Sequence, residues 1–204
     1  MDATTRCARG AWAGCGIHTP AFASEADVGG REEDRAMKVT LEPWAEADLP
    51  LLERANTPEM TRYVGGPEPA EKLIERNQRY LRLSASGEAE MFRVEVDGEP
   101  AGGIGFWQVD EGGRPAYETG WNTLPEFQGR GVARAALRML IPRVVARGDR
   151  DLLVAYPGQD NAASNALCRG AGFVHTDSGS EPWRGGVLHY NVWTLTLTQQ
   201  ALGR

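Results

Sequence analysis

A glutamine and two glycines stand between a strand-like stretch and a long apolar-striped stretch, in the run Gln128-Gly129-Arg130-Gly131-Val132-Ala133. Gly129 and Gly131 let the backbone bend tightly, so that several backbone N–H groups can point toward one place. A helix that starts near Gly131 adds its free N-terminal amides and the positive end of its dipole. Neither Gly-Lys-Ser/Thr nor the spacing Gly-x-Gly-x-x-Gly is present, which excludes an ATP-binding P-loop and a dinucleotide fingerprint. The run therefore predicts an anion-binding loop of another kind.

The elements on either side of this loop must hold it in place. Residues 117–124 read as a strand, and residues 131–147 carry apolar side chains at helical spacing. Pro142 lies inside the second stretch, where it removes one hydrogen bond and should kink or shorten the helix. Residues 152–156 form a short apolar run, which is typical of a strand covered on both faces.

The other predicted elements indicate a mostly antiparallel sheet. Strands are predicted at residues 37–44, 91–96 and 101–109, the last two joined through Asp97-Gly98-Glu99-Pro100. Helices are predicted at residues 45–55, 70–84 and 161–171, and Asp160 or Asn161 is suited to cap the last of these. Two final strands are predicted at residues 187–191 and 192–198. Antiparallel strands with helices on both faces predict one α/β domain of the α+β or mixed type.

Composition narrows the kind of partner. At 204 residues with a net charge of −6, the chain has the length of one ordinary domain and no broad basic surface for nucleic acid or acidic membranes. Cys7, Cys15 and Cys168 are scattered, which argues against a disulfide framework or a zinc site and favours a cytoplasmic location. His175 and His189 show no metal-ligand spacing, so no metal is expected.

Residues 1–36 differ from the rest of the chain. They are rich in alanine, glycine and small polar residues and show no periodicity. A secretory signal would need an apolar core of roughly 7 to 15 residues, and only Ala11, Trp12 and Ala13 are available. We expect a disordered tail, or a start codon assigned too early, with the domain running from Met37 to Arg204.

Three pieces in one order carry a family resemblance. Residues 118–127 (Glu-Thr-Gly-Trp-Asn-Thr-Leu-Pro-Glu-Phe) lead into the glycine loop, and later comes Asn161-Ala162-Ala163-Ser164-Asn165-Ala166-Leu167, ending in Gly170-Ala171-Gly172-Phe173. This order resembles the GNAT superfamily of acyl-CoA N-acyltransferases, and within it the branch of the ribosomal-protein-alanine N-acetyltransferases. Residues 56–63 (Asn-Thr-Pro-Glu-Met-Thr-Arg-Tyr) are also similar to that branch. The resemblance covers residues 37–197.

The resemblance implies a GNAT fold, with a twisted, mixed but mostly antiparallel sheet of about seven strands and helices on both faces. The strand at residues 121–124 should splay from the one at residues 152–156. The implied co-substrate is acetyl-CoA, with no metal. Its pyrophosphate would bind the amides of Gln128, Gly129, Arg130, Gly131, Val132 and Ala133. Its pantetheine arm would bind Asn122, Thr123, Leu124, Asn161 and Ser164.

The implied reaction is direct attack of a free amine on the acetyl thioester in a ternary complex. A backbone N–H near Asn122 or Leu124 would stabilise the charge that develops on the thioester oxygen. Glu118 is the candidate general base, and the alternative is that it pairs with an arginine on an exposed strand face. Many relatives have a tyrosine as proton donor where this chain has Cys168, so Ser164 or a water would replace it here.

The acceptor is left open. A protein N-terminus, a small amine, an amino acid or an aminoglycoside-like amine would all fit, because the fold and coenzyme site are shared across acceptors. Trp107, Trp121 and Trp183 either line an acceptor pocket or belong to the core and its rim. A catalytically inactive acyl-CoA-binding module that acts as a sensor or partner is the alternative function. A homodimer is one assembly that such domains form.

Overall fold

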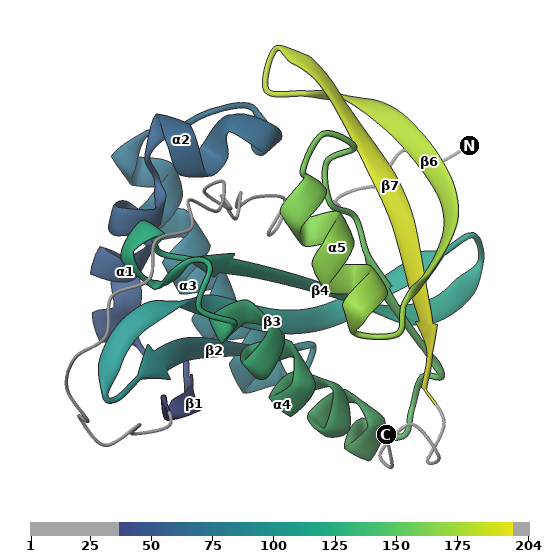
Figure 1. The fold of residues 1–204 in the computed structure, drawn as a ribbon, viewed down its shortest axis with the longest axis horizontal. Helices are drawn as coiled ribbons and strands as arrows, with labels where there is room; N and C mark the ends of the chain where they lie inside the picture. The colour runs from purple at the N-terminus through teal and green to yellow at the C-terminus, as the bar shows by residue number, and fades with distance from the viewer. Residues whose placement is uncertain (1–36, 198–204) are drawn as a thin grey trace, which may run out of the picture.

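The computed structural model describes residues 37–197 (Figure 1). The expectations for residues 1–36, and for the end of the last predicted strand at Thr198, lie outside the described residues. In the described part, one sheet of seven strands has the order β1-β2-β3-β4-β5-β7-β6. The strands are β1 (Val39–Pro43), β2 (Ala89–Val96), β3 (Glu99–Glu111), β4 (Arg114–Thr123), β5 (Leu152–Ala155), β6 (Val174–Trp183) and β7 (Gly186–Thr196).

Neighbouring strands are antiparallel except β4 and β5, which are parallel. The helices are α1 (Leu49–Ala55), α2 (Pro58–Thr61), α3 (Ala70–Ser86), α4 (Val132–Arg147) and α5 (Ala162–Gly170), with short 3-10 turns η1 (Glu46–Asp48), η2 (Arg62–Val64) and η3 (Pro125–Phe127). Helices α4 and α5 lie in front of the sheet and α1 to α3 lie behind it (Figure 1). None of these helices is long and apolar enough to span a bilayer. The predicted fold class is confirmed.

The hairpin between β2 and β3 turns at Asp97 and Gly98, the first two of the four residues in the predicted connection, and Glu99 and Pro100 already belong to β3. Asp97 and Gly98 both have positive φ angles, of 53° and 88°. A two-residue turn of this kind matches the twist of antiparallel strands, and glycine adopts it without a steric cost. The turn fixes the register in which β3 reaches β4, and thus the level at which β4 presents its side chains.

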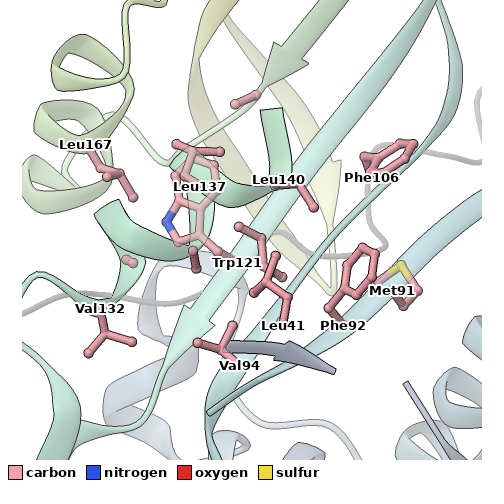
Figure 2. Close-up of a cluster of buried hydrophobic side chains, with 14 of the residues drawn as sticks. Leu41, Met91, Phe92, Val94, Phe106, Trp121, Val132, Leu137, Leu140 and Leu167 are labelled. Carbon is pink, nitrogen blue, oxygen red and sulfur yellow. The ribbon is translucent and has the colours of Figure 1, made fainter. Parts of the chain in front are cut away.

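Helix α4 packs its apolar stripe on the front of the sheet (Figure 2). Leu137, Leu140 and Val144 are fully buried there. Pro142 does not shorten the helix, which continues to Arg147. Its ring is on the exposed side, so the carbonyl of Arg138, which loses its helical donor, can bind water instead.

The C-terminal strands differ from the prediction. Residues 174–183 form β6, which the sequence pattern did not indicate, and β7 is one strand rather than two strands at 187–191 and 192–198. Strand β6 is the edge of the sheet and mostly exposed, so it has no apolar alternation to recognise. The polar Asn191 interrupts the apolar pattern of β7. Its side chain has a partner there, because Asn191 Nδ2 donates to Asn165 Oδ1 at 2.8 Å.

Residues 45–55 also differ in detail from the single predicted helix. They form the 3-10 turn η1 followed by α1, with Pro50 in the first turn of α1, where a proline needs no N–H. The predicted loop at residues 57–69 contains α2, which Thr57 caps by accepting from the Met60 N–H at 3.2 Å.

Candidate functional site

A cleft opens where β4 and β5 separate. The two strands pair only at Tyr117 with Leu153 and at Glu118 with Val154. Beyond Glu118, β4 continues to Thr123 along β3, and within the described residues it has no further β5 partner. The cleft holds about 470 Å³ of space, part of it open to solvent. The predicted splay of these two strands is confirmed.

Three predicted site residues line this cleft together: Glu118 from β4, and Asn161 and Ser164 from the start of α5. Tyr63, Val64, Tyr156 and Leu188 also line it, and sequence reasoning had assigned none of them to the site. Asn122, Thr123, Leu124 and the loop at residues 128–133 lie farther along β4, outside this lining.

Glu118 stands at the fork, since it is the last β4 residue that pairs with β5. Only 4% of it is exposed, which rules out the alternative that it lies on an exposed strand face. Its cross-strand neighbour on β3 is Trp107, so both side chains are on the same face of the sheet. A carboxylate held inside a cleft in this way can accept a proton from a bound group.

The glycine loop has the geometry of an anion site. Gly131 is the N-cap of α4 in the left-handed conformation, with φ of 81°, and no side chain caps the helix. Gly129 is also left-handed, with φ of 72°. A Cβ atom at either glycine would meet nothing within 4 Å, so the backbone conformation rather than packing requires glycine. The first amides of α4 are therefore open to an anion.

Gln128 fastens this loop to the end of β4. Its side-chain Nε2 donates to the Thr123 carbonyl at 2.8 Å. Val132 and Ala133 are buried, so they can contact a ligand through their backbone amides and not through their side chains. The first turn of α4 carries no acidic residue, and the exposed Arg130 lies over the Phe127 ring. The local charge therefore favours an anion.

The backbone donors of β4 alternate between its two neighbours. The Leu124 N–H donates to the Ala101 carbonyl of β3 at 2.8 Å, so this donor cannot face the cleft as the sequence analysis allowed. Successive strand N–H groups point to opposite sides, so the donors on the β5 side belong to Thr123 and Trp121. Asn122 is engaged with β3 as well, since its Oδ1 accepts from the Gly103 N–H at 3.0 Å.

Helix α5 begins at the predicted cap. Asn161 Oδ1 accepts from the Ser164 N–H at 3.1 Å, so Asn161 and not Asp160 is the N-cap. Both residues of this pair are only 3% exposed. Cys168, one turn later, is completely buried in the core, and burial raises the pKa of its thiol from 9.0 to about 12. The thiol packs as a small apolar group of the core.

A residue beside the cleft that the sequence did not single out has several hydrogen-bond partners. Asn165 on α5 is only 8% exposed. Its side chain bonds both to the β5–α5 loop and to β7. It thus holds the segment that contains Gly158 and Asn161, both of which line the cleft. An asparagine inside a short helix gives no sequence signal for this role.

The three tryptophans singled out by the sequence have different places. Trp121 borders the cleft, and its ring packs among Leu137, Leu140 and Leu167 of the core (Figure 2). Trp183 lies in a neighbouring groove. Trp107 is buried on β3 and is not among the residues that line either space. Within residues 37–197, no group of three or more acidic, histidine or cysteine side chains could hold a metal.

Comparison with known proteins agrees with this geometry. The family model of the acetyltransferase (GNAT) domain matches residues 38–174, more than half of the chain. The protein therefore belongs to the GNAT acetyltransferases.

Solved structures share the fold at low sequence identity. One is an acetyltransferase from Salmonella typhimurium that modifies the N-terminal serine of 50S ribosomal subunit protein L7/L12, with 22% identity and a TM-score of 0.67 over 78% of this chain and 95% of that one. The aminoglycoside acetyltransferase AAC(6')-Ib in complex with coenzyme A has 19% identity and a TM-score of 0.64, over 80% and 96%. The microcin C7 self-immunity acetyltransferase MccE, bound to acetyl-CoA and AMP, has 18% identity and a TM-score of 0.65, over 78% and 92%.

Proposed function

We propose that this protein is an acetyl-CoA-dependent N-acetyltransferase that moves an acetyl group to a primary amine, either a protein N-terminus or a small amine. One observation carries the proposal: β4 has a buried carboxylate at the fork with β5 and, at its other end, an uncapped helix N-terminus behind two left-handed glycines. That arrangement suits an elongated co-substrate with a phosphate group at one end and a reactive group at the other.

The residues have separate tasks in this proposal. Amides of residues 128–133 bind the pyrophosphate, and Gln128 keeps that loop on β4. The free edge of β4 pairs with the amide-rich pantetheine arm, and Asn161 and Ser164 face the arm from α5. Acetyl-CoA supplies an acetyl group activated as a thioester. The N–H of Thr123 or Trp121 stabilises the charge that develops on the thioester oxygen.

Proton transfer completes the chemistry. The amine must be neutral to attack, so Glu118, directly or through a water, accepts a proton from the attacking nitrogen. The C–N bond forms as the C–S bond breaks in the ternary complex, without a covalent intermediate on the protein. The departing thiolate takes a proton from Ser164 or from water, because Ser164 lines the cleft whereas the Cys168 thiol is buried in the core and does not line it.

Calorimetric titration of the full chain with acetyl-CoA, with adenosine as control, tests the binding step. Micromolar affinity for acetyl-CoA alone supports the loop assignment, and no binding by the folded chain refutes the proposal. An amine-acceptor screen that follows thiol release then tests catalysis. Binding without turnover on any amine would favour an inactive acyl-CoA-binding module that acts as sensor or partner.

Glu118→Gln separates binding from chemistry. We expect turnover to fall by about a hundredfold or more while acetyl-CoA affinity is unchanged. Glu99→Gln, an exposed glutamate on β3, is the matched control and should behave as the wild type. Normal turnover of Glu118→Gln at every pH would remove Glu118 from the mechanism.

A reducing compartment such as the cytoplasm fits the free, buried Cys168.

A further inference from the structure

Trp107 lies directly opposite Glu118 where β3 pairs with β4. Both side chains leave the same face of the sheet, with Cβ atoms about 5 Å apart for such a pair. Trp107 is 5% exposed and Glu118 is 4% exposed, so both are buried. Glu118 lines the cleft and Trp107 does not, so the indole is separated from a molecule bound in the cleft. Trp107 can therefore act on the reaction only through Glu118.

The indole N–H of Trp107 is a buried donor without an acceptor in the described structure. Its Nε1 atom has no hydrogen-bond partner among residues 37–197. Trp44 is similarly buried, and its Nε1 does have one, since it donates to Asn77 Oδ1 at 2.7 Å. Leaving a buried donor unpaired is costly, so a protein that keeps one has a reason to do so.

The surroundings of Trp107 in the sheet indicate which group its N–H can reach. Apart from Glu118, the positions around it on this face have small or apolar side chains. These positions are Ala89 on β2, Gly105 and Val109 on β3, and Ala116 and Gly120 on β4. The backbone carbonyls of these inner strands point along the sheet toward neighbouring strands. The Glu118 carboxylate is therefore the strong acceptor that the sheet places beside the indole.

Two glycines determine how an amine can approach the same carboxylate. Gly105 and Gly120 lie opposite each other, two residues along from the Trp107–Glu118 pair and on the same face. A Cβ on Gly105 would lie 2.6 Å from the Met91 side chain, so Met91 fills the β3 side. Gly120 lines the cleft instead. An amine in the cleft therefore approaches Glu118 across Gly120, whereas the indole approaches it from β3.

We propose that Trp107 is a positioning residue, whose indole N–H donates to one oxygen of the Glu118 carboxylate in the coenzyme-bound protein. This inference rests on the proposed function. Hydrogen bonds at catalytic groups are often long in the free enzyme and shorten in the complex. The second carboxylate oxygen then stays turned toward the cleft. The indole N–H only donates, so it does not compete for the proton that Glu118 accepts.

The proton transfer is simple in this arrangement. An N–H bond of the ammonium breaks and an O–H bond forms on the cleft-facing oxygen of Glu118, which leaves the nitrogen lone pair free to attack. Until then the indole stabilises the charged carboxylate. Trp107 therefore keeps the base both oriented and ionised.

The pH dependence of the Trp107 indole resonance tests the contact without catalysis. Proton–nitrogen correlation NMR of the full-length protein, with and without coenzyme A, records it as the resonance that Trp107→Phe loses. We expect it to move as Glu118 titrates, and not to move in Glu118→Gln. The Trp44 indole, which is bonded to an amide that does not titrate, is the internal control. A response that is absent with and without coenzyme A, or that persists in Glu118→Gln, overturns the inference.

Kinetics of Trp107→Phe test the role, because this variant keeps an aromatic ring and loses the N–H. We expect kcat to fall by about tenfold, the scale of one hydrogen bond to a charged group, with acetyl-CoA affinity unchanged. With one amine used throughout, the acid limb of the kcat profile should move to higher pH, because loss of the donor favours the protonated carboxyl. In a Glu118→Gln background the same substitution should change kcat by less than about twofold.

Trp44→Phe is the matched control. It removes an indole N–H that has an acceptor, so it should lower the urea midpoint and leave kcat and its pH profile unchanged. An unchanged kcat in Trp107→Phe, or an equal loss of kcat with and without Glu118, overturns the inference.

The two measurements also separate this inference from the proposed function. An indole response that depends on Glu118, without acetylation of any amine, would refute the proposed function and support the contact. Acetylation of an amine without such a response would do the reverse.

Discussion

Asn165→Ala is the sharpest test of how the site is held together. The Nδ2 of Asn165 donates to the carbonyls of Gly158 at 2.9 Å and Asn161 at 2.8 Å. Its Oδ1 accepts from Asn191 Nδ2 and from Trp193 Nε1, both at 2.8 Å. One side chain therefore links α5, the loop before it and β7.

The magnitude follows from what the substitution leaves behind. Each of these hydrogen bonds contributes roughly 0.5–1.5 kcal/mol, and a buried donor left without its acceptor costs about 1–3 kcal/mol. Trp193 is only 4% exposed, so its indole N–H would lose its acceptor in a place that water does not reach. We expect Asn165→Ala to lower the free energy of unfolding by about 3–5 kcal/mol, a large part of the roughly 5–15 kcal/mol of a typical domain.

Urea denaturation followed by tryptophan fluorescence measures this change. Gln159→Ala is the control. Its exposed side chain lies in the same loop and makes a long hydrogen bond, from Nε2 to the Tyr190 carbonyl at 3.4 Å, so the free energy of unfolding should fall by no more than about 1 kcal/mol. A loss below about 1 kcal/mol for Asn165→Ala would refute the reasoning, since it would mean that the network contributes no more than one ordinary hydrogen bond.

Asn165→Asp tests the hydrogen bonds that the Nδ2 group of Asn165 donates. The carboxylate keeps the acceptor for Trp193 but turns an oxygen toward the carbonyls of Gly158 and Asn161. The pKa of this new carboxyl should rise above the value of about 3.9 in the unfolded chain, because its charged form is disfavoured. The destabilisation is then complete above the raised pKa and shrinks as the pH falls toward about 4.

Two further predictions concern the coenzyme loop and the buried thiol. Gly131→Val should cost about 1–3 kcal/mol of backbone strain and also weaken acetyl-CoA binding by calorimetry. Gly148→Val, at the left-handed C-cap of the same helix, should cause similar strain with unchanged affinity, and equal affinities for the two variants would contradict the loop assignment. Because burial raises the pKa of the Cys168 thiol from 9.0 to about 12, the folded state holds this proton more tightly, and its stabilising effect is present below pH 9 and lost as the pH rises to about 12. Between these pH values, the urea midpoint should fall less steeply with pH in Cys168→Ala than in the wild type. An identical slope in the two proteins would show that the thiol is not involved.

The candidate site could be predicted from the sequence where it depends on backbone geometry. Gly129 and Gly131 are recognisable because the left-handed conformation favours glycine. The helix cap was narrowed to Asp160 or Asn161 for a similar reason, since a short acceptor side chain is needed there, and the structure shows Asn161. Leu152 to Ala155 read correctly as a strand because both of its faces are buried.

What could not be predicted depends on contacts between distant segments. Strand β6 is exposed at the sheet edge, so its sequence carries no apolar period. The hydrogen bond from Trp183 to the Val64 carbonyl joins residues 119 positions apart, and neither residue type indicates such a partner in the sequence. The sequence also could not show that the Leu124 N–H points to β3 and not into the cleft, because the side of a strand to which each N–H points depends on its register with its neighbours.

The geometry of β4 explains how one strand can serve both ends of an elongated co-substrate. Pairing with β5 stops at Glu118, whereas pairing with β3 continues to Thr123. Residues beyond Glu118 therefore remain part of the sheet through β3, while their edge on the β5 side is open. The six residues from Glu118 to Thr123 are separated by five steps, which span roughly 17 Å at the usual rise per residue. The Thr123 carbonyl then receives Gln128 Nε2, which fixes the glycine loop relative to the strand. The distance between the Glu118 carboxylate and the glycine loop is therefore set by β4 together with the Gln128 hydrogen bond at its end.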